Sequence, residues 1–227
     1  MRRLAVAVRR LRDRPEDGFT LLELTVALLI MGVIAAAVTS VLYSVQRTYE
    51  RESYRSQSND QARLAVEQLD REIRSGNLLY DPDPNPQPVP CPLWVCDTTN
   101  HIFPGMALLV YTQNNATTHS PGNRCVQWRI YQNQLQVRDW SPEWRNDGIV
   151  DAFRVVADNV LNQSLSPQVK AFQRDTDQAK GGRAMKITVI ANVSSVGGSN
   201  VTIQQEITGR DTEYGYPSSV CVDIPPY

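Results

Sequence analysis

The sequence predicts an α+β protein in which one long N-terminal helix packs on an antiparallel β-sheet domain. An uncharged apolar run at residues 24–45 continues without a break into an amphipathic helical pattern that reaches Arg74. Alternating prolines follow, and strand-like alternation of apolar and polar residues dominates the remainder. The 227 residues are 41% hydrophobic and 21% charged, which excludes disordered, collagen-like and multi-span membrane proteins.

The apolar run is the first predicted element and a candidate membrane span. As a helix, residues 24–45 extend about 33 Å, close to the roughly 30 Å of a bilayer's hydrocarbon core. The preceding residues 1–18 contain six arginines and three acidic residues. This basic flank favours a cytoplasmic N-terminus. Everything after Val45 is then outside the cytoplasm, where disulfides can form.

Glu23 distinguishes between interpretations of this segment. A plain signal-anchor helix explains its length and orientation, and a secretory signal peptide would use the small residues at 35–37 as a cleavage site. Neither explains a carboxylate at the edge of an apolar run. An acid in that position is costly unless something pairs with it, so Glu23 is a candidate functional residue.

The stretch Gly18-Phe19-Thr20-Leu21-Leu22-Glu23, followed by the apolar run, resembles the class III leader and N-terminal helix of type IV prepilins and type II secretion pseudopilins. The resemblance implies that prepilin peptidase, a membrane aspartyl protease, removes residues 1–18 and methylates the amine of Phe19. It also implies that Glu23 meets the N-terminal amine of a neighbouring subunit during filament assembly. Opposite charges in an apolar bundle offset each other's desolvation cost.

The helix continues through residues 46–76, where apolar side chains recur at three- and four-residue steps and Asp70 and Arg74 are spaced as a helical ion pair. Ser75-Gly76-Asn77 is a stop signal. A helix over residues 19–74 would be about 84 Å long. Residues 19–45 would form its membrane and filament-core half. The sequence RLAVEQLDREIRSGN also resembles the corresponding helix of the PilW/PulJ class of minor pilins and minor pseudopilins.

Residues 77–227 are predicted to form a β-rich globular domain. A proline-rich connector at residues 81–92 favours an extended, polyproline-like path. One hairpin is predicted around a turn near Asn133, and a second around residues 197–200. Periodicity leaves residues 152–162 open between helix and strand.

Four cysteines allow three disulfide pairings. Our preferred hypothesis joins Cys91 to Cys96 across the proline-rich segment and Cys125 to Cys221 between the sheet and the C-terminal tail, although spacing alone does not select it. Zinc is less favoured, because a C-x4-C spacing with unpatterned histidines is a weak ligand set in an oxidising compartment. We expect no metal and no cofactor.

The sequence gives little support for an enzymatic function or for nucleic-acid binding. The chain has no H-E-x-x-H, G-x-S-x-G or phosphate-binding glycine loop, so we expect no enzyme activity. An interpretation as a DNA contact rests on arginines that interleave with aromatic residues, a pattern that combines phosphate contact with base stacking. The alternative is that the tryptophans are core residues. The residues concerned are Arg124, Arg129, Arg138, Arg145, Trp128, Tyr131, Trp140 and Trp144.

Four N-x-[ST] sequences, at Asn115, Asn162, Asn192 and Asn200, are interpreted as coincidental, because a bacterial-type prepilin gives no reason to expect N-glycosylation.

The resemblance predicts a minor structural subunit, anchored by one span in the cytoplasmic membrane and then assembled into a periplasmic pseudopilus or a surface pilus. It implies as partners prepilin peptidase, other major and minor pilins or pseudopilins, the inner-membrane assembly platform, and membrane lipid before assembly. The same N-terminus serves adhesion, motility, competence and secretion. The rival interpretation is a membrane-anchored or secreted extracytoplasmic domain that binds a ligand.

Overall fold

The computed structural model describes residues 18, 20–84, 92–97, 102–114, 122–175, 183–192, 200–210 and 216–226. The chain divides into two compact units, Met1–Tyr49 and Glu50–Tyr227. The boundary falls inside the helix α2, which spans Leu21–Ser75.

Helix α2 confirms the predicted long helix, with bounds within two residues of those expected. Its ion pair Asp70–Arg74 is formed, at 2.8 Å. The predicted stop is also correct, but strand β1 (Gly76–Leu79) follows with no connecting loop. Gly76 permits this abrupt change, because a Cβ at that position would lie 2.7 Å from Val110 Cγ1.

The larger sheet has five antiparallel strands in the order β1-β2-β3-β4-β5. Gln132 and Asn133 both have positive φ and form the two-residue turn of the predicted hairpin. Residues 152–162, left open by periodicity, contain a strand. The strands are β2 (Ala107–Asn114), β3 (Gly122–Tyr131), β4 (Gln134–Trp140) and β5 (Arg154–Ala157), and a short helix α3 (Trp144–Asp147) lies between the last two.

A second, three-stranded antiparallel sheet contains β6 (Phe172–Arg174), β7 (Ala184–Ala191) and β8 (Val201–Thr208). The pair β7–β8 is the second predicted hairpin, and its turn lies outside the described residues. The single antiparallel sheet expected from the sequence is therefore two sheets. The physical reason is that the apolar stripe of α2 is buried against side chains from both sheets, which together form one core.

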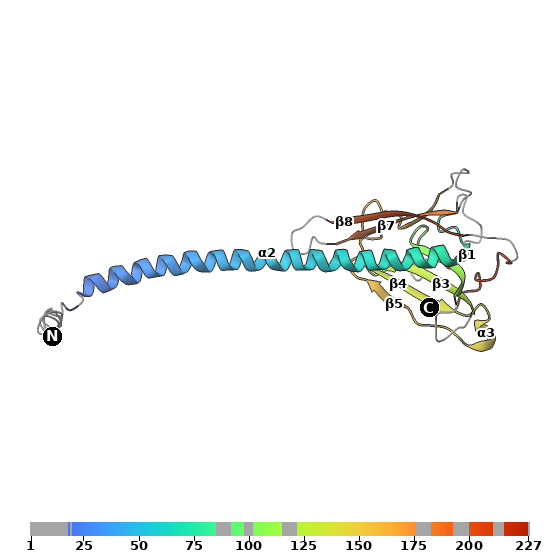
Figure 1. Ribbon diagram of the computed structural model, residues 1–227, viewed down its shortest axis with the longest axis horizontal. Coiled ribbons are helices and arrows are strands. Elements are labelled where there is room, and N and C mark those ends of the chain that lie inside the picture. Colours follow the sequence, from blue (N-terminus) through green and yellow to red (C-terminus); the bar gives the residue numbers. More distant parts are fainter. Residues whose placement is uncertain are drawn as a thin grey trace, which may run out of the picture. The chain divides into compact units, whose positions relative to one another are not determined.

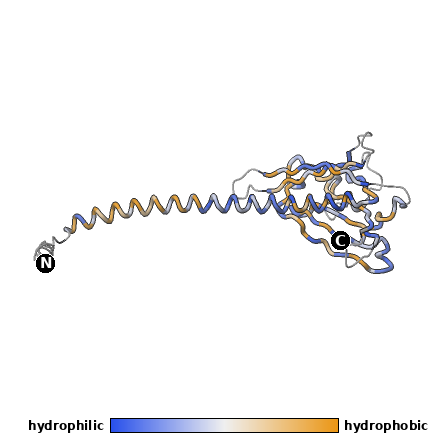
Figure 2. The backbone as a smooth tube through the Cα atoms, in the orientation of Figure 1, coloured by the Kyte–Doolittle hydropathy of each residue, from blue (hydrophilic) through white to orange (hydrophobic). Residues whose placement is uncertain are grey.

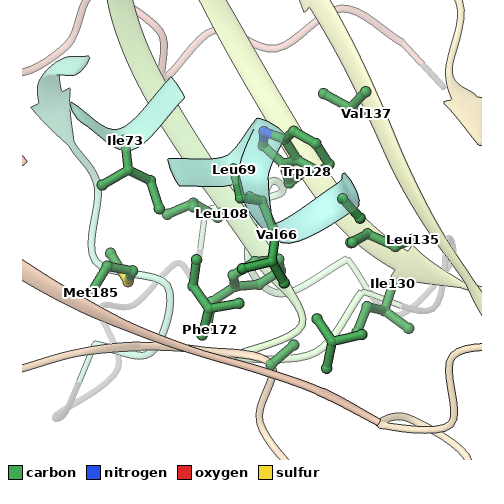
Figure 3. Packing of buried hydrophobic residues seen from close by; sticks show 14 of the residues in the cluster. Val66, Leu69, Ile73, Leu108, Trp128, Ile130, Leu135, Val137, Phe172 and Met185 are labelled. Atoms are coloured by element: carbon green, nitrogen blue, oxygen red, sulfur yellow. The ribbon is translucent and has the colours of Figure 1, made fainter. Parts of the chain in front are cut away.

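Within Glu50–Tyr227, the outer part of α2 lies between the two sheets (Figure 1). Val66, Leu69 and Ile73 project from the helix into one core (Figure 3). Their neighbours come from both sheets and include Leu108, Trp128, Ile130, Leu135, Val137, Phe172 and Met185. Burial on α2 begins at Ser58, and residues 46–57 are exposed on every side.

The five-stranded sheet is covered on its second face as well. A smaller core there joins Leu109, Tyr111 and Trp140 to Trp94 and the C-terminal segment 216–226. Cys125 and Cys221 form a disulfide within this core. Because both faces are covered, seven of the ten residues of β3 are buried, including polar side chains that the alternating pattern placed toward solvent.

Candidate assembly site at the N-terminus

Thr20 positions the start of α2. Its Oγ1 accepts a hydrogen bond from the Glu23 backbone N–H at 3.2 Å, and its carbonyl accepts one from Leu24 N at 3.1 Å. Thr20 is therefore the N-cap residue and Glu23 the third helical residue, the spacing of a capping box. Sequence reasoning gave Thr20 no role, although T-x-x-E before an apolar run is the signal that would have found it.

Glu23 is exposed in the first turn of α2. None of the ion pairs among the described residues involves its carboxylate. Its negative charge complements the positive end of the helix dipole, an interaction worth about 0.3–1 kcal/mol at an exposed site. Gly18 is exposed just before the cap, whereas Phe19, the predicted site of cleavage and methylation, lies outside the described residues.

The helix beyond Glu23 suits an apolar environment. Leucine, isoleucine and valine side chains between 21 and 45 are exposed. This part of the chain is mostly hydrophobic (Figure 2), and α2 is long and apolar enough to cross a membrane. The hydroxyls of Thr25, Thr39 and Ser40 donate to carbonyls one turn earlier, at 2.8 Å in each case. These polar groups therefore need no water.

A capped apolar helix of membrane-spanning length, with an acid in its first turn and a β-rich domain after it in the chain, fits a protein with a single-pass membrane anchor. A family model described as the prokaryotic N-terminal methylation motif matches residues 13–39. This motif is typical of type IV prepilins and pseudopilins, so the chain has a pilin-like N-terminus of the kind processed by prepilin peptidase. No curated protein matches the chain.

Of the predicted cysteine sites, Cys125 and Cys221 are paired with each other. Cys96 is also disulfide-bonded, whereas Cys91 lies outside the described residues, as do His101 and His119. In the described part of the chain, no group of three His, Cys, Asp or Glu residues could hold a metal ion.

In the arginine–aromatic pattern, Arg138 packs on the ring of Trp140 at 5.1 Å to its centroid, and Arg145 packs on the ring of Trp144 at 4.6 Å. Trp128 and Trp140 are buried on opposite faces of the five-stranded sheet. Arg124 is buried against α2, where it pairs with Glu72 at 2.9 Å and with Asp139 at 3.1 Å. Burial raises the pKa of Glu72, although Arg124 acts in the opposite direction. Trp128 and Trp140 are therefore core residues, as the alternative interpretation of this pattern predicts, while DNA contact stays a prediction.

Arg129 and Arg138 lie on the second face of the sheet, where their guanidinium groups pack on the ring of Phe153 at 3.5 and 4.5 Å. Arg138 also donates to the carbonyls of Pro225 and Pro226 at 3.0 and 3.1 Å. Arg138 therefore holds the C-terminal segment on the sheet, whereas Arg129 donates to Gln136 Oε1 on the neighbouring strand at 3.0 Å.

Arg145, which is exposed, and Trp144, which is half-buried, contact the same segment. Arg145 pairs with Asp223 and lowers the pKa of that carboxyl, and Trp144 Nε1 donates to the Asp223 carbonyl at 3.0 Å.

Asn162, the first residue of one N-x-[ST] sequence, has a structural role in the fold. The side chain is fully buried, and its amide donates to the carbonyls of Val169 and Thr188 at 3.1 and 2.7 Å. Its carbonyl accepts from Ile190 N at 2.9 Å. The side-chain amide therefore connects the loop at Val169 to strand β7 by hydrogen bonds, and its burial makes it inaccessible to a glycan. Asn192 and Asn200 lie in the described residues, and Asn115 lies outside them.

Proposed function

We propose that the chain is a minor subunit of a type IV pilus or type II secretion pseudopilus. The observation that carries this proposal is the coincidence of the methylation motif at residues 13–39 with a capped helix whose first turn presents Glu23. In this proposal prepilin peptidase cuts after Gly18, methylates Phe19 and leaves Thr20 as the cap of the mature chain's helix.

Glu23 and the new N-terminus act together in assembly. Cleavage creates an amine four residues before Glu23, and both charges lie at the edge of an apolar helix. A neighbouring subunit supplies the complementary amine, which offsets the desolvation of the carboxylate as the helices pack. A register slip would leave both charges without a partner, so the pair selects one axial offset between subunits.

The minor-subunit assignment is supported by the resemblance of residues 63–77 to the PilW/PulJ class. This stretch includes the end of α2, whose apolar face packs into the core of the β-rich domain. Such a subunit would join other minor subunits and the inner-membrane assembly platform in a complex that primes the filament near its tip. The role is structural rather than enzymatic.

The first test is mass spectrometry of the N-terminal peptide from protein recovered from its native membrane or filaments. Methylated Phe19 is the expected result. An N-terminus at Val38 would indicate ordinary signal-peptide cleavage, and an intact leader in cells with active peptidase would indicate a simple anchor. Either result contradicts the proposal.

Glu23→Ala tests the assembly step separately. The variant should be cleaved and methylated normally but be depleted from sheared filaments, because its neighbour's amine lacks a partner. The matched control is Glu50→Ala, which removes an exposed acid from the same helix. Normal incorporation of the Glu23 variant would contradict this role.

One observation favours the rival function. A cleft of about 340 Å³ lies at the end of β1 and is lined by Leu78, Leu79, Tyr80, Asp81, Arg174, Tyr216 and Ser218. Aromatic and charged side chains around a hollow of this size are typical of small-ligand sites. An extracytoplasmic ligand-binding domain would use this cleft, and it predicts one of the two alternative N-termini in the mass-spectrometric test.

A further inference from the structure

Three arginines recur at four-residue steps on α2 immediately after the apolar run, at Arg47, Arg51 and Arg55. With 3.6 residues per turn, successive members are displaced by only about 40° around the helix and about 6 Å along it. They therefore form one stripe, called here the arginine stripe. Arginines four residues apart on a helix repel each other, at a cost of a few tenths of a kcal/mol per pair.

No contact of α2 among the described residues offsets the repulsion between these three arginines. Residues 46–57 are exposed, although Arg55 also lines a cleft with Val201 of β8 at the edge of the core. Among the described residues, none of the ion pairs involves any of the three arginines. The one side-chain hydrogen bond in the stripe runs from Arg47 to the neutral Tyr43 hydroxyl, at 2.6 Å. A ligand that carries negative charge would relieve the repulsion.

The position of the stripe identifies the chemistry of that ligand. Measured along the helix from Val45, the arginines follow at about 3, 9 and 15 Å. A bilayer's headgroup region is about 5–8 Å thick on each side. Side chains on a helix tilt toward its N-terminus, which here is toward the apolar run. Arg47 therefore lies at headgroup level directly, and Arg51 and Arg55 extend back toward it through their long side chains.

Tyrosines flank the stripe, as expected at a membrane interface. Tyr43 and Tyr54 are each 56% exposed and lie beside it on the helix, and the guanidinium of Arg47 packs 4.3 Å from the centre of the Tyr43 ring. Tyrosine is enriched at membrane–water boundaries, where its ring is apolar and its hydroxyl hydrated. The stripe is thus continuous with a candidate span and has the composition of an interfacial anchor.

We propose that the arginine stripe binds the phosphate groups of anionic phospholipids in the leaflet at the outer end of the apolar helix, before the subunit leaves the membrane. Guanidinium groups bind phosphate oxygens in pairs, which makes arginine suited to this contact. The inference rests on the proposed function, because residues 24–45 must span the membrane. Beyond that function, the inference assigns the subunit a preference for anionic phospholipids, which insertion of residues 24–45 alone would not produce.

Glu50 and Glu52 limit the expected preference for anionic over neutral phospholipids. These acids flank the stripe, so residues 46–57 carry one net positive charge. A basic residue near an anionic membrane surface contributes about a fivefold preference, and we expect this value for the whole segment.

The test is native mass spectrometry of the full chain in detergent supplied with equal amounts of phosphatidylglycerol and phosphatidylcholine. The wild type should retain phosphatidylglycerol about fivefold more than phosphatidylcholine. The triple variant Arg47→Gln, Arg51→Gln, Arg55→Gln should retain both equally, and the corresponding triple lysine variant should keep most of the preference. Since these residues are exposed, the glutamine variant should unfold at the wild-type temperature.

The matched control is Arg63→Gln, Arg71→Gln, Arg74→Gln, which removes three exposed arginines at least about 24 Å farther along the same helix than Arg47. It should keep the wild-type preference. Absence of a preference in the wild type, an unchanged preference in the stripe variant, or an equal loss in the control would each overturn the inference. The N-terminal peptide of the same preparation reports the proposed function independently, so failure of one is distinguishable from failure of the other.

Discussion

Arg124 illustrates how one buried cation connects separate elements. Its side chain, only 6% exposed, lies between Glu72 of α2 and Asp139 of β4. Two carboxylates would repel each other in this position without the guanidinium between them. The arginine therefore permits a polar contact at the interface between helix and sheet.

Arg124→Ala should lower the free energy of unfolding by about 3–5 kcal/mol, because it leaves two poorly hydrated carboxylates facing each other. Urea unfolding of the purified protein measures the loss. The control, Arg63→Ala, removes an exposed arginine from α2 and should change stability by less than about 0.5 kcal/mol. A loss no larger than the control's would show that Arg124 is not needed at this interface.

Glu72→Gln should change how stability depends on pH. Burial raises the pKa of Glu72 above its ordinary value of 4.5 in the folded protein, so the folded state holds this proton more tightly than the unfolded state. The contribution of this carboxyl to the free energy of unfolding is therefore fully present below the ordinary pKa. It is lost as pH rises through the raised pKa of the folded state. The wild type should therefore lose stability relative to Glu72→Gln between pH 4.5 and neutrality. Parallel stability curves for the two proteins would contradict this sign.

At the scale of elements, patterns that are local in sequence were predictable and contacts between distant segments were not. Both ends of α2 and the turn at Asn133 follow from helical periodicity and turn chemistry. Strands β1 and β6 have four and three residues, too few for a periodic signal, and exist because longer strands pair with them. The capping role of Thr20 could be predicted from the T-x-x-E spacing, whereas the burial of Arg138 depends on a segment almost 90 residues away.

The C-terminal segment 216–226 depends on its disulfide. Replacing Cys125 and Cys221 together by alanine should lower the free energy of unfolding by roughly 2–5 kcal/mol, because the bond closes a loop with a sequence separation of 96. Denaturation monitored by tryptophan fluorescence should also report a more hydrated Trp140. Ser219→Ala, in the same segment and exposed, is the control and should behave as the wild type. Equal stability of the two variants would contradict the prediction.

At the scale of the whole molecule, the two units differ in what stabilises them. The described residues of Met1–Tyr49 are exposed apolar helix, whereas Glu50–Tyr227 contains both cores. Burial on α2 starts at Ser58. The second unit therefore contains every helical residue that its core uses.

A fragment of residues 50–227 should consequently fold without the apolar helix. A fragment of residues 68–227 should not, because it lacks the buried Ala62, Ala65 and Val66. Those side chains contribute about 3–5 kcal/mol, a large part of a typical domain's total stability of about 5–15 kcal/mol. Circular dichroism melting compares the two fragments. A cooperative transition for the shorter one, or none for the longer one, would contradict this division.

The Cys125–Cys221 bond also has a topological consequence. Most of β3 and all of β4 to β8 lie between the two cysteines, so this part of the chain is a covalent ring. A protease that nicks any loop within the ring opens it but releases no fragment. The strands on both sides of the cut remain tethered to α2, and the second sheet stays with its helix until a reductant or a second cut separates them.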